Sequence, residues 1–264
     1  MKIILSRKGW DSGCGGRASP VFPDKTIQSL PIGCTPGSPL YGDIHPHAVG
    51  TQGHPDLADL IAPAAYPARY KVLPFAHLDP DLERGAYARD AGWTPCFGQE
   101  NSSGAAAYLD NQGVGAGDLF LFYGWFDDVT RHPAGWRGSG NDRFLVWGWL
   151  QVGDIFHNPT EGNTPPWLHY HPHVIHGTSY KKNRIYVATR RLSVPGIPPS
   201  KFPGGGVFGV EANSRLISST PGKRGRYPSR LPAGISLPSK HRQEHVIRAK
   251  DEDASRWVAS LFEA

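Results

Sequence analysis

The chain has 264 residues and a net charge of +5, a mild excess that suits an anionic ligand or nucleic acid but is also common in soluble proteins. Its three cysteines, Cys14, Cys34 and Cys96, are odd in number and widely spaced, which argues against a disulfide framework and a CxxC zinc site. No segment approaches the roughly 18 apolar residues of a membrane span, and the apolar run near the start is too short for a signal peptide. A soluble, cytoplasmic protein is expected.

The predicted elements begin with a short buried strand, KIILSR at residues 2–7, which opens into a Gly-rich turn. Residues 31–55 carry five prolines and predict a loop. YKVLPFAHL at 70–78 predicts a strand, and DPDLERGAYARD after it predicts a helix with Asp79 as N-cap and Glu83 near its first turn. The alanines of residues 102–112 predict a second helix.

Two apolar, aromatic segments at 117–126 and 143–156 predict an antiparallel strand pair joined by a long polar loop. Residues 184–192 and 205–210 are further strand candidates, 221–234 form a basic loop, and 251–264 predict an amphipathic C-terminal helix. The 32 glycines and 25 prolines favour short elements over long helices. One strand-dominated α+β domain spanning residues 1–264 is predicted.

Four of the 12 histidines of the chain lie in LHYHPHVIHG, residues 168–177. In an extended strand His169, His171 and His173 would share one face, and Pro172 favours extended backbone at His171. His176 falls outside this alternation. Neutral imidazoles that converge in this way are good ligands for transition metals.

A second candidate is HLDPDL, in which His77 and Asp79 stand two residues apart at a strand end. Together with the later histidines they would supply two imidazoles and one carboxylate, the facial set of non-heme iron oxygenases. The plain alternative is a set of surface histidines and a capped turn. The His-rich loop at 42–54 has the character of an exposed insertion.

Three weaker signals concern substrate binding. Arg7 or Lys8, beside the Gly-rich turn, would meet an anion, although a purely structural turn is favoured because no P-loop pattern is present. Trp125, Trp147 and Trp149 would stack on a base or simply fill the core. The amides of Gln99, Asn111 and Gln112 would bind a base edge or cap turns.

The motifs KIILSRKGWDSGCGG, HLDPDL, NQGVGAGDLFLFYGWF, VWGWLQVGDI, HPHV and RQEHVI resemble a known family. It is the nucleotide-modification-associated domain, third family of that series, and the resemblance covers nearly the whole chain. It implies a role in modifying nucleobases or nucleotides, without specifying the reaction. The segment from about residue 100 to 160 is also similar to PUA-like (EVE and ASCH) domains. This similarity implies an elaborated β-barrel. The alternative is a mixed sheet with a few short helices.

The family pattern points to a set of positions here: His77, Asp79, Gln99, Asn111, Gln112, Asp118, Trp125, His171 and His173. His245 stands where an aromatic residue is expected and is not assigned as a ligand.

The leading hypothesis is a metal-dependent, oxidative enzyme that modifies a nucleobase, nucleotide or related small substrate. The metal, Fe(II) in preference to Zn(II), would be held by His77, Asp79, His171 and His173, with Gln99 also in the catalytic set. The substrate would be bound by Arg7, Lys8, Asn111, Gln112 and Trp125. The alternative is a non-catalytic reader of modified bases with an aromatic pocket. A nucleic-acid-related partner is compatible with either, no membrane partner is expected, and no oligomeric state is predicted.

Overall fold

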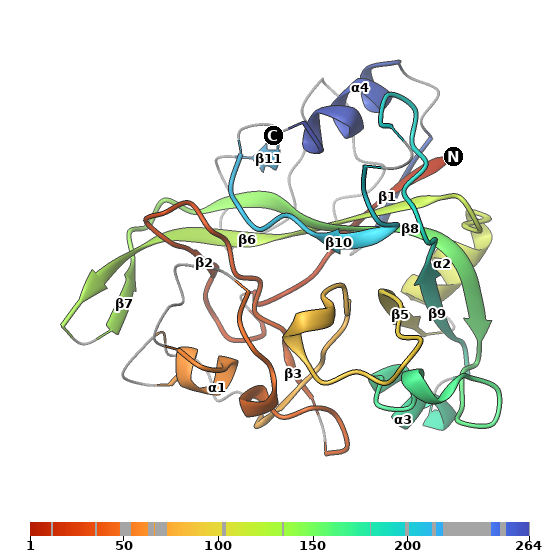
Figure 1. Ribbon diagram of the computed structural model, residues 1–264, viewed down its shortest axis with the longest axis horizontal. Helices are drawn as coiled ribbons and strands as arrows, with labels where there is room; N and C mark the ends of the chain where they lie inside the picture. Colours follow the sequence, from red (N-terminus) through yellow and green to blue (C-terminus); the bar gives the residue numbers. More distant parts are fainter. Residues whose placement is uncertain are drawn as a thin grey trace.

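A ten-stranded mixed sheet organises the protein in the computed structural model (Figure 1). The structure describes residues 1–11, 13–34, 36–47, 54–62, 66, 73–101, 104–133, 135–179, 181–198, 201–212, 215–218, 244–248 and 252–263. The main path of the sheet runs β12 (Glu244–Arg248), β1 (Lys2–Arg7), β6 (Leu119–His132), β8 (Arg143–His157), β9 (Asn183–Ala188) and β5 (Cys96–Glu100).

Four shorter strands join this sheet: β10 (Gly205–Val207) and β11 (Leu216–Ser218) pair with β8, while β2 (Ser19–Val21) and β7 (Gly135–Gly138) pair with β6. The strands β3 (Gly33–Cys34) and β4 (Phe75–Ala76) form a separate two-stranded sheet. The α-helices are α1 (Leu57–Leu60), α2 (Ala105–Asn111), α3 (Pro172–Ile175) and α4 (Glu252–Leu261). Single 3-10 turns lie at Tyr41–Asp43, Arg84–Ala86, Pro166–Leu168 and Gly177–Ser179.

The long strands β6 and β8 form the predicted antiparallel pair and are buried on both faces. Because side chains alternate along a strand, Leu119 and Leu121 face one core while Phe120 and Phe122 face another. Helix α4 covers the first of these faces, above the sheet in Figure 1. The second face carries the segments that build the candidate site.

Trp125 packs against the core under α4. It is partly buried there, on the face opposite the candidate site. Trp149 belongs to the same core, as the core-packing alternative predicted.

The two edge strands of the main path, β12 and β5, meet through side chains. Gln99 Nε2 on β5 donates a hydrogen bond to Glu244 Oε1 on β12, and the amide of Val246 donates to the hydroxyl of Tyr108 on α2 at 3.4 Å. We call this junction the seam. Since no backbone pairing joins the described parts of β5 and β12, the sheet is not closed into a barrel. The mixed-sheet alternative is confirmed, and the PUA-like barrel is not.

Most predicted elements are present. The strand at residues 2–7, the helix within 102–112 (described from Ala105), the strands near 184 and 205 and the C-terminal helix are confirmed. The predicted helix after Asp79 is wrong: only the 3-10 turn Arg84–Ala86 forms there. The strand predicted at 70–78 is reduced to Phe75–Ala76. Residues 70–72 and the predicted basic loop at 221–234 lie outside the described residues. Within the described ranges, none of the helices has the length and apolar character needed to cross a bilayer.

Candidate metal centre

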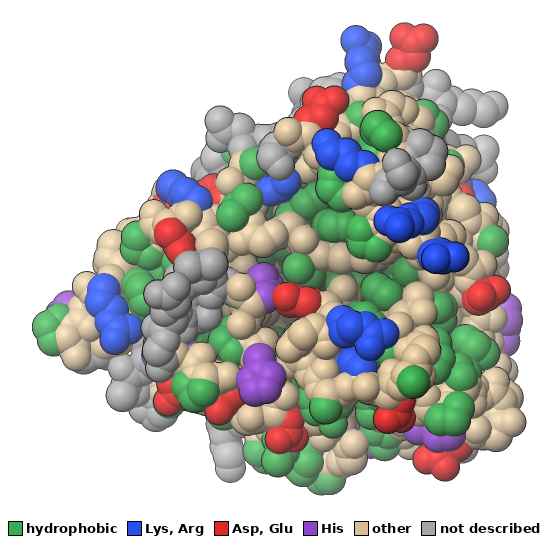
Figure 2. All heavy atoms as spheres, in the orientation of Figure 1, with side chains coloured by type: hydrophobic (Ala, Val, Ile, Leu, Met, Phe, Trp, Pro, Cys, Tyr) green, Lys and Arg blue, Asp and Glu red, His purple; other side chains and the backbone are tan. Residues whose placement is uncertain are grey.

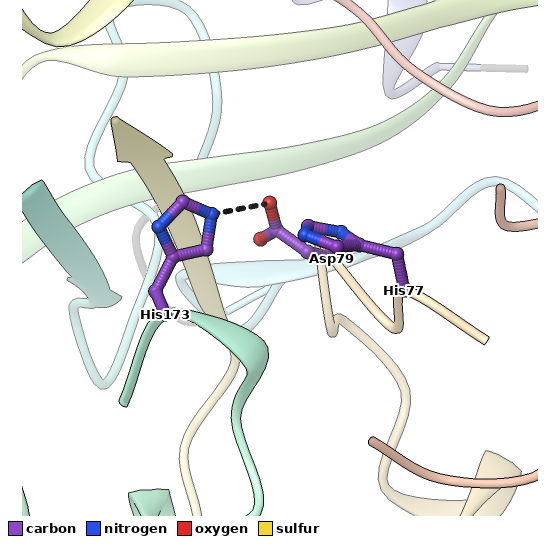
Figure 3. Close-up of side chains that lie close together, drawn as sticks. All are labelled: His77, Asp79 and His173. Carbon is purple, nitrogen blue, oxygen red and sulfur yellow. Dashed lines mark ion pairs between the residues drawn. The ribbon is translucent and has the colours of Figure 1, made fainter. Parts of the chain in front are cut away.

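His77, Asp79 and His173 converge on one point below the sheet (Figure 3). One ligand atom from each lies within 4.8 Å of the others. His77 and Asp79 follow β4, whereas His173 lies on α3, so the cluster joins segments that are almost 100 residues apart. The HPH segment therefore lies beside the HLD segment, through His173.

The HPH segment reaches this point by a different route from the predicted strand. Pro172 occupies the first position of α3, where its missing N–H and fixed φ suit a helix start, and His171 is the N-cap. The ring Nδ1 of His171 accepts a hydrogen bond from the amide of His173 at 3.2 Å. The alternation that was expected to place His169 beside these two residues is therefore wrong. His169 Nε2 instead lies 3.3 Å from the carbonyl oxygen of Thr164.

Asp79 is held from three sides and does not cap a helix. Its Oδ1 accepts the amide of Gly98 at 2.7 Å and lies 3.6 Å from His171 Nε2, while Oδ2 lies 3.5 Å from His173 Nε2. Burial by itself would raise the pKa of this carboxyl, but His171 and His173 outweigh that effect and hold the pKa of Asp79 well below its usual range. The Gly98 amide thus anchors the carboxylate.

The orientation of Asn183 fixes the proton on His173. Asn183 Nδ2 donates to the carbonyl oxygen of His173 at 2.7 Å, so its Oδ1 must accept from His173 Nδ1, also at 2.7 Å. In the neutral ring, Nε2 then carries a lone pair that faces the Asp79 carboxylate. Two acceptors aimed at each other need a shared cation or a second proton. A polar group that fixes the far nitrogen is typical of metal-bound histidines.

His171 has the opposite arrangement. Its Nδ1 already accepts the His173 amide, so in the neutral ring the proton resides on Nε2, which points toward Asp79 Oδ1. A nitrogen that carries a proton has no lone pair for a metal. His171 is fully buried and is placed to orient the carboxylate.

His77 completes the cluster from the cavity side. Its ring lies edge-to-face with that of His173, with centroids 5.6 Å apart. Burial lowers the pKa of His77 to about 4; Asp79 opposes this effect, and His173, His171 and Lys8 add to it. At neutral pH the imidazole is uncharged, which is the form that binds metals.

The three residues border a cavity of ≈ 410 Å³, within the usual range for small-molecule sites. Of the residues predicted to act on substrate, Arg7, Lys8 and Gln99 line it. Gly98 also lines it and allows His173 to approach, because a Cβ at residue 98 would lie 2.2 Å from His173 Cδ2. A smaller cavity of ≈ 60 Å³, bordered by Trp147 and Leu78, shares Asp79 as a wall.

Both cations of the cavity are already paired. Lys8 Nζ lies 3.6 Å from Glu244 Oε1 at the seam and 4.7 Å from the ring centre of Phe97. Arg7 lies 3.5 Å from Asp11. Burial raises the pKa of Glu244, and Lys8 opposes this rise.

The remaining predicted residues lie elsewhere. Asn111 and Gln112 lie at the end of α2 and do not line the cavity. Trp125, which packs against the core under α4, does not line it either. Asp118 accepts the backbone amide of Lys2 at 2.6 Å. Three residues that the motifs did not single out shape the site instead: Gly98, Asn183 and Glu244.

A buried ion pair between Arg89 and Asp81 lies next to the segments that carry the cluster. Arg89 donates to Asp81 Oδ1 at 2.5 Å, and its guanidinium lies 4.8 to 5.2 Å from the ring centres of Tyr87, Trp93 and Tyr170. We call this group the arginine cage. Burial raises the pKa of Asp81 even though Arg89 opposes the rise. Because Asp81 follows the HLD segment and Tyr170 precedes HPH, the cage ties the two ligand segments together.

On the face shown in Figure 2, basic side chains occur in several separate groups with acidic ones between them. The basic side chains visible on this face thus do not form one continuous basic surface.

Comparison with known proteins gives one relationship. Neither a curated protein nor a solved structure matches the chain. Residues 2–261 match the family described as nucleotide modification associated domain 3, which is nearly the entire sequence. The chain therefore belongs to the nucleotide modification associated domain 3 family.

Proposed function

We propose that the protein is a metal-dependent enzyme that modifies a nucleobase, a nucleotide or a related small substrate in the cytoplasm. The observation that carries the proposal is the convergence of His77, Asp79 and His173 at the wall of a cavity large enough for a base. Family membership supplies the nucleotide theme.

The proposed ligands are His77, Asp79 and His173. His77 is uncharged at neutral pH, and in neutral His173 the lone pair lies on Nε2, which faces the Asp79 carboxylate. We assign His171 the role of orienting Asp79 rather than binding the metal, since its hydrogen bond to the His173 amide leaves the proton on the nitrogen that faces Asp79.

The balance of charge supports a divalent ion. The cavity and the wall directly behind it contain two cations, Arg7 and Lys8, and four carboxylates, Asp11, Asp79, Glu100 and Glu244. When all are ionised, a divalent cation brings this partly buried set to neutrality. Uncompensated charge in such surroundings is costly.

Fe(II) is the favoured metal because two histidines and one carboxylate on one side leave open positions, and iron in this setting supplies oxidative chemistry. The proposed reaction class is oxygenation. A C–H bond of the substrate becomes C–OH with one atom of O2, and the other atom leaves as water after a co-reductant supplies two electrons and two protons. Zn(II), which would activate a water molecule for hydrolysis, is the second choice.

A non-catalytic reader of modified bases is the rival. The reader hypothesis relied on an aromatic pocket, but the cavity contains no Trp, Tyr or Phe among its described lining residues. The geometry thus supplies metal ligands where the reader needs stacking surfaces.

The test is the metal content of protein purified without a His-tag, followed by dioxygen consumption with nucleosides and nucleotides. Wild-type protein is expected to hold about one equivalent of metal, and His173→Ala to lose it. His169→Ala is the matched control, because that histidine lies in the same segment and contacts only Thr164 among the contacts described for it. Metal below about a tenth of an equivalent, unchanged by His173→Ala, would refute the proposal.

A further inference from the structure

The hydrogen-bonding capacity of the cavity wall is unevenly used. Three carboxylates line the cavity, and two of them have partners in the chain. Asp11 accepts the amides of Gly13 and Cys14 at 2.7 and 2.8 Å, and Asp79 accepts the amide of Gly98.

Glu100 is the third carboxylate and differs from the other two. It ends β5 and lines the cavity, and its Oε2 is buried without a hydrogen-bond partner among the described residues. A buried carboxylate oxygen in this state costs free energy until a donor or a cation reaches it. No described residue supplies such a donor, and a ligand in the cavity would be able to do so.

The neighbouring Gln99 adds a second acceptor. Its Nε2 donates one N–H to Glu244 Oε1, an orientation that leaves Oε1 as the acceptor of this side chain. Gln99 therefore keeps the acceptor Oε1 and the second N–H of its amide. Gln99 also lines the cavity.

The two cationic donors of the wall, in contrast, are engaged. Lys8 faces Glu244 across the seam and Arg7 faces Asp11, as described above. Both cations of the wall are thus engaged, whereas Glu100 Oε2 has no partner among the described residues. This property suits the N–H edge of a neutral base better than a phosphate group.

We propose that the cavity selects a guanine base, with the carboxylate of Glu100 as the acceptor for the paired N–H groups of its Watson–Crick edge and Gln99 as a second acceptor. Guanine places a ring N–H directly beside an amino group, and a carboxylate accepts two such parallel donors. Adenine and cytosine place a ring acceptor beside their amino group, and that acceptor would repel the carboxylate. This assignment deepens the proposed function, since it names the base offered to the metal.

The experiment is equilibrium binding of guanosine, inosine, adenosine and cytidine to the metal-loaded protein by calorimetry. Guanosine is expected to bind most tightly, and inosine, which lacks the amino group, about tenfold more weakly. Glu100→Gln should weaken guanosine about 10- to 100-fold, because an amide replaces one acceptor by a donor. Glu161→Gln, at an exposed loop position, is the matched control and should bind as wild type does.

Three results would overturn the assignment: equal binding of guanosine and adenosine, unchanged guanosine binding by Glu100→Gln, or no binding of any nucleoside at millimolar concentration. A wild-type metal content near two equivalents that falls to one in Glu100→Gln would also overturn it, because Glu100 would then be a cation ligand. Metal content measured on the same samples separates these results from failure of the proposed function. The base preference can fail while the first metal equivalent stays intact, and it can hold in a metal-free protein.

Discussion

Gly98→Ala is the sharpest test of the geometry around His173. A Cβ at this position would lie 2.2 Å from His173 Cδ2, 2.5 Å from Cγ and 2.7 Å from Nε2. Ordinary contact begins at 3.4 Å, so the ring must withdraw by about 1.2 Å. The 2.7 Å bond from His173 Nδ1 to Asn183 cannot follow such a shift without breaking, because Asn183 is fully buried at the start of β9.

We expect Gly98→Ala to destabilise the protein by about 1–3 kcal/mol and to weaken metal binding about 10- to 100-fold. The first effect is measured by urea denaturation and the second by competition with a chelator at fixed pH. Gly115→Ala is the matched control, since nothing lies within 4 Å of its added Cβ. A folded Gly98→Ala protein with wild-type stability and wild-type metal affinity would refute the packing described for β5 and His173.

Three further predictions concern the surroundings of the cluster. Asn183→Leu removes the acceptor for His173 Nδ1–H and should weaken metal binding about 10- to 100-fold in the chelator assay, whereas an unchanged affinity would exclude Asn183 from positioning the ring. Arg89→Met leaves Asp81 buried without its cation and should lower the free energy of unfolding by about 3–5 kcal/mol in urea denaturation. Adding Asp81→Asn should recover part of this stability. If the double variant loses as much stability as the two single variants together, the pairing is contradicted. In metal-free protein, His77 has a folded-state pKa of about 4 against an ordinary 6.5, so the unfolded state binds more protons between these values. The contribution of His77 to the free energy of unfolding is then complete above pH 6.5 and is lost as the pH falls toward 4. This contribution is at most about 3 kcal/mol. A His77→Asn variant whose stability depends on pH as that of the wild type does would rule it out.

The strands that build the scaffold were predictable because their patterns are strong. The runs at 117–126 and 143–156 are long, apolar and aromatic, and they become β6 and β8. The amphipathic C-terminal segment becomes α4, whose Trp257 and Leu261 pack on the sheet. These elements depend on local periodicity, which a single sequence contains.

The local conformations at the site were not predictable in the same way. Pro172 permits both an extended predecessor and a helix start, and the protein uses both, with His171 extended and Pro172 in the first turn. Asp79 has the sequence context of an N-cap, but its carboxylate is taken by the amide of Gly98, a tertiary partner that periodicity cannot reveal.

Two site residues that the motifs missed, Gly98 and Asn183, differ in whether the sequence contains a signal for them. A glycine inside a strand, as in CFGQE, indicates close approach of another group, and Gly98 is such a case. Asn183 gives no signal in the sequence, since its role depends on β9 lying beside α3.

The seam has a consequence for how the protein is assembled during synthesis. The first strand of the chain, β1, pairs with β12, so that Ile4 lies opposite Val246 across nearly the full length of the sequence. A ribosome-bound chain that has not yet exposed residue 244 has no partner for this edge of β1 and no carboxylate opposite Lys8. The ion pair that holds Lys8 at the cavity is therefore completed only after residue 244 has been synthesised, later than the HLD and HPH segments.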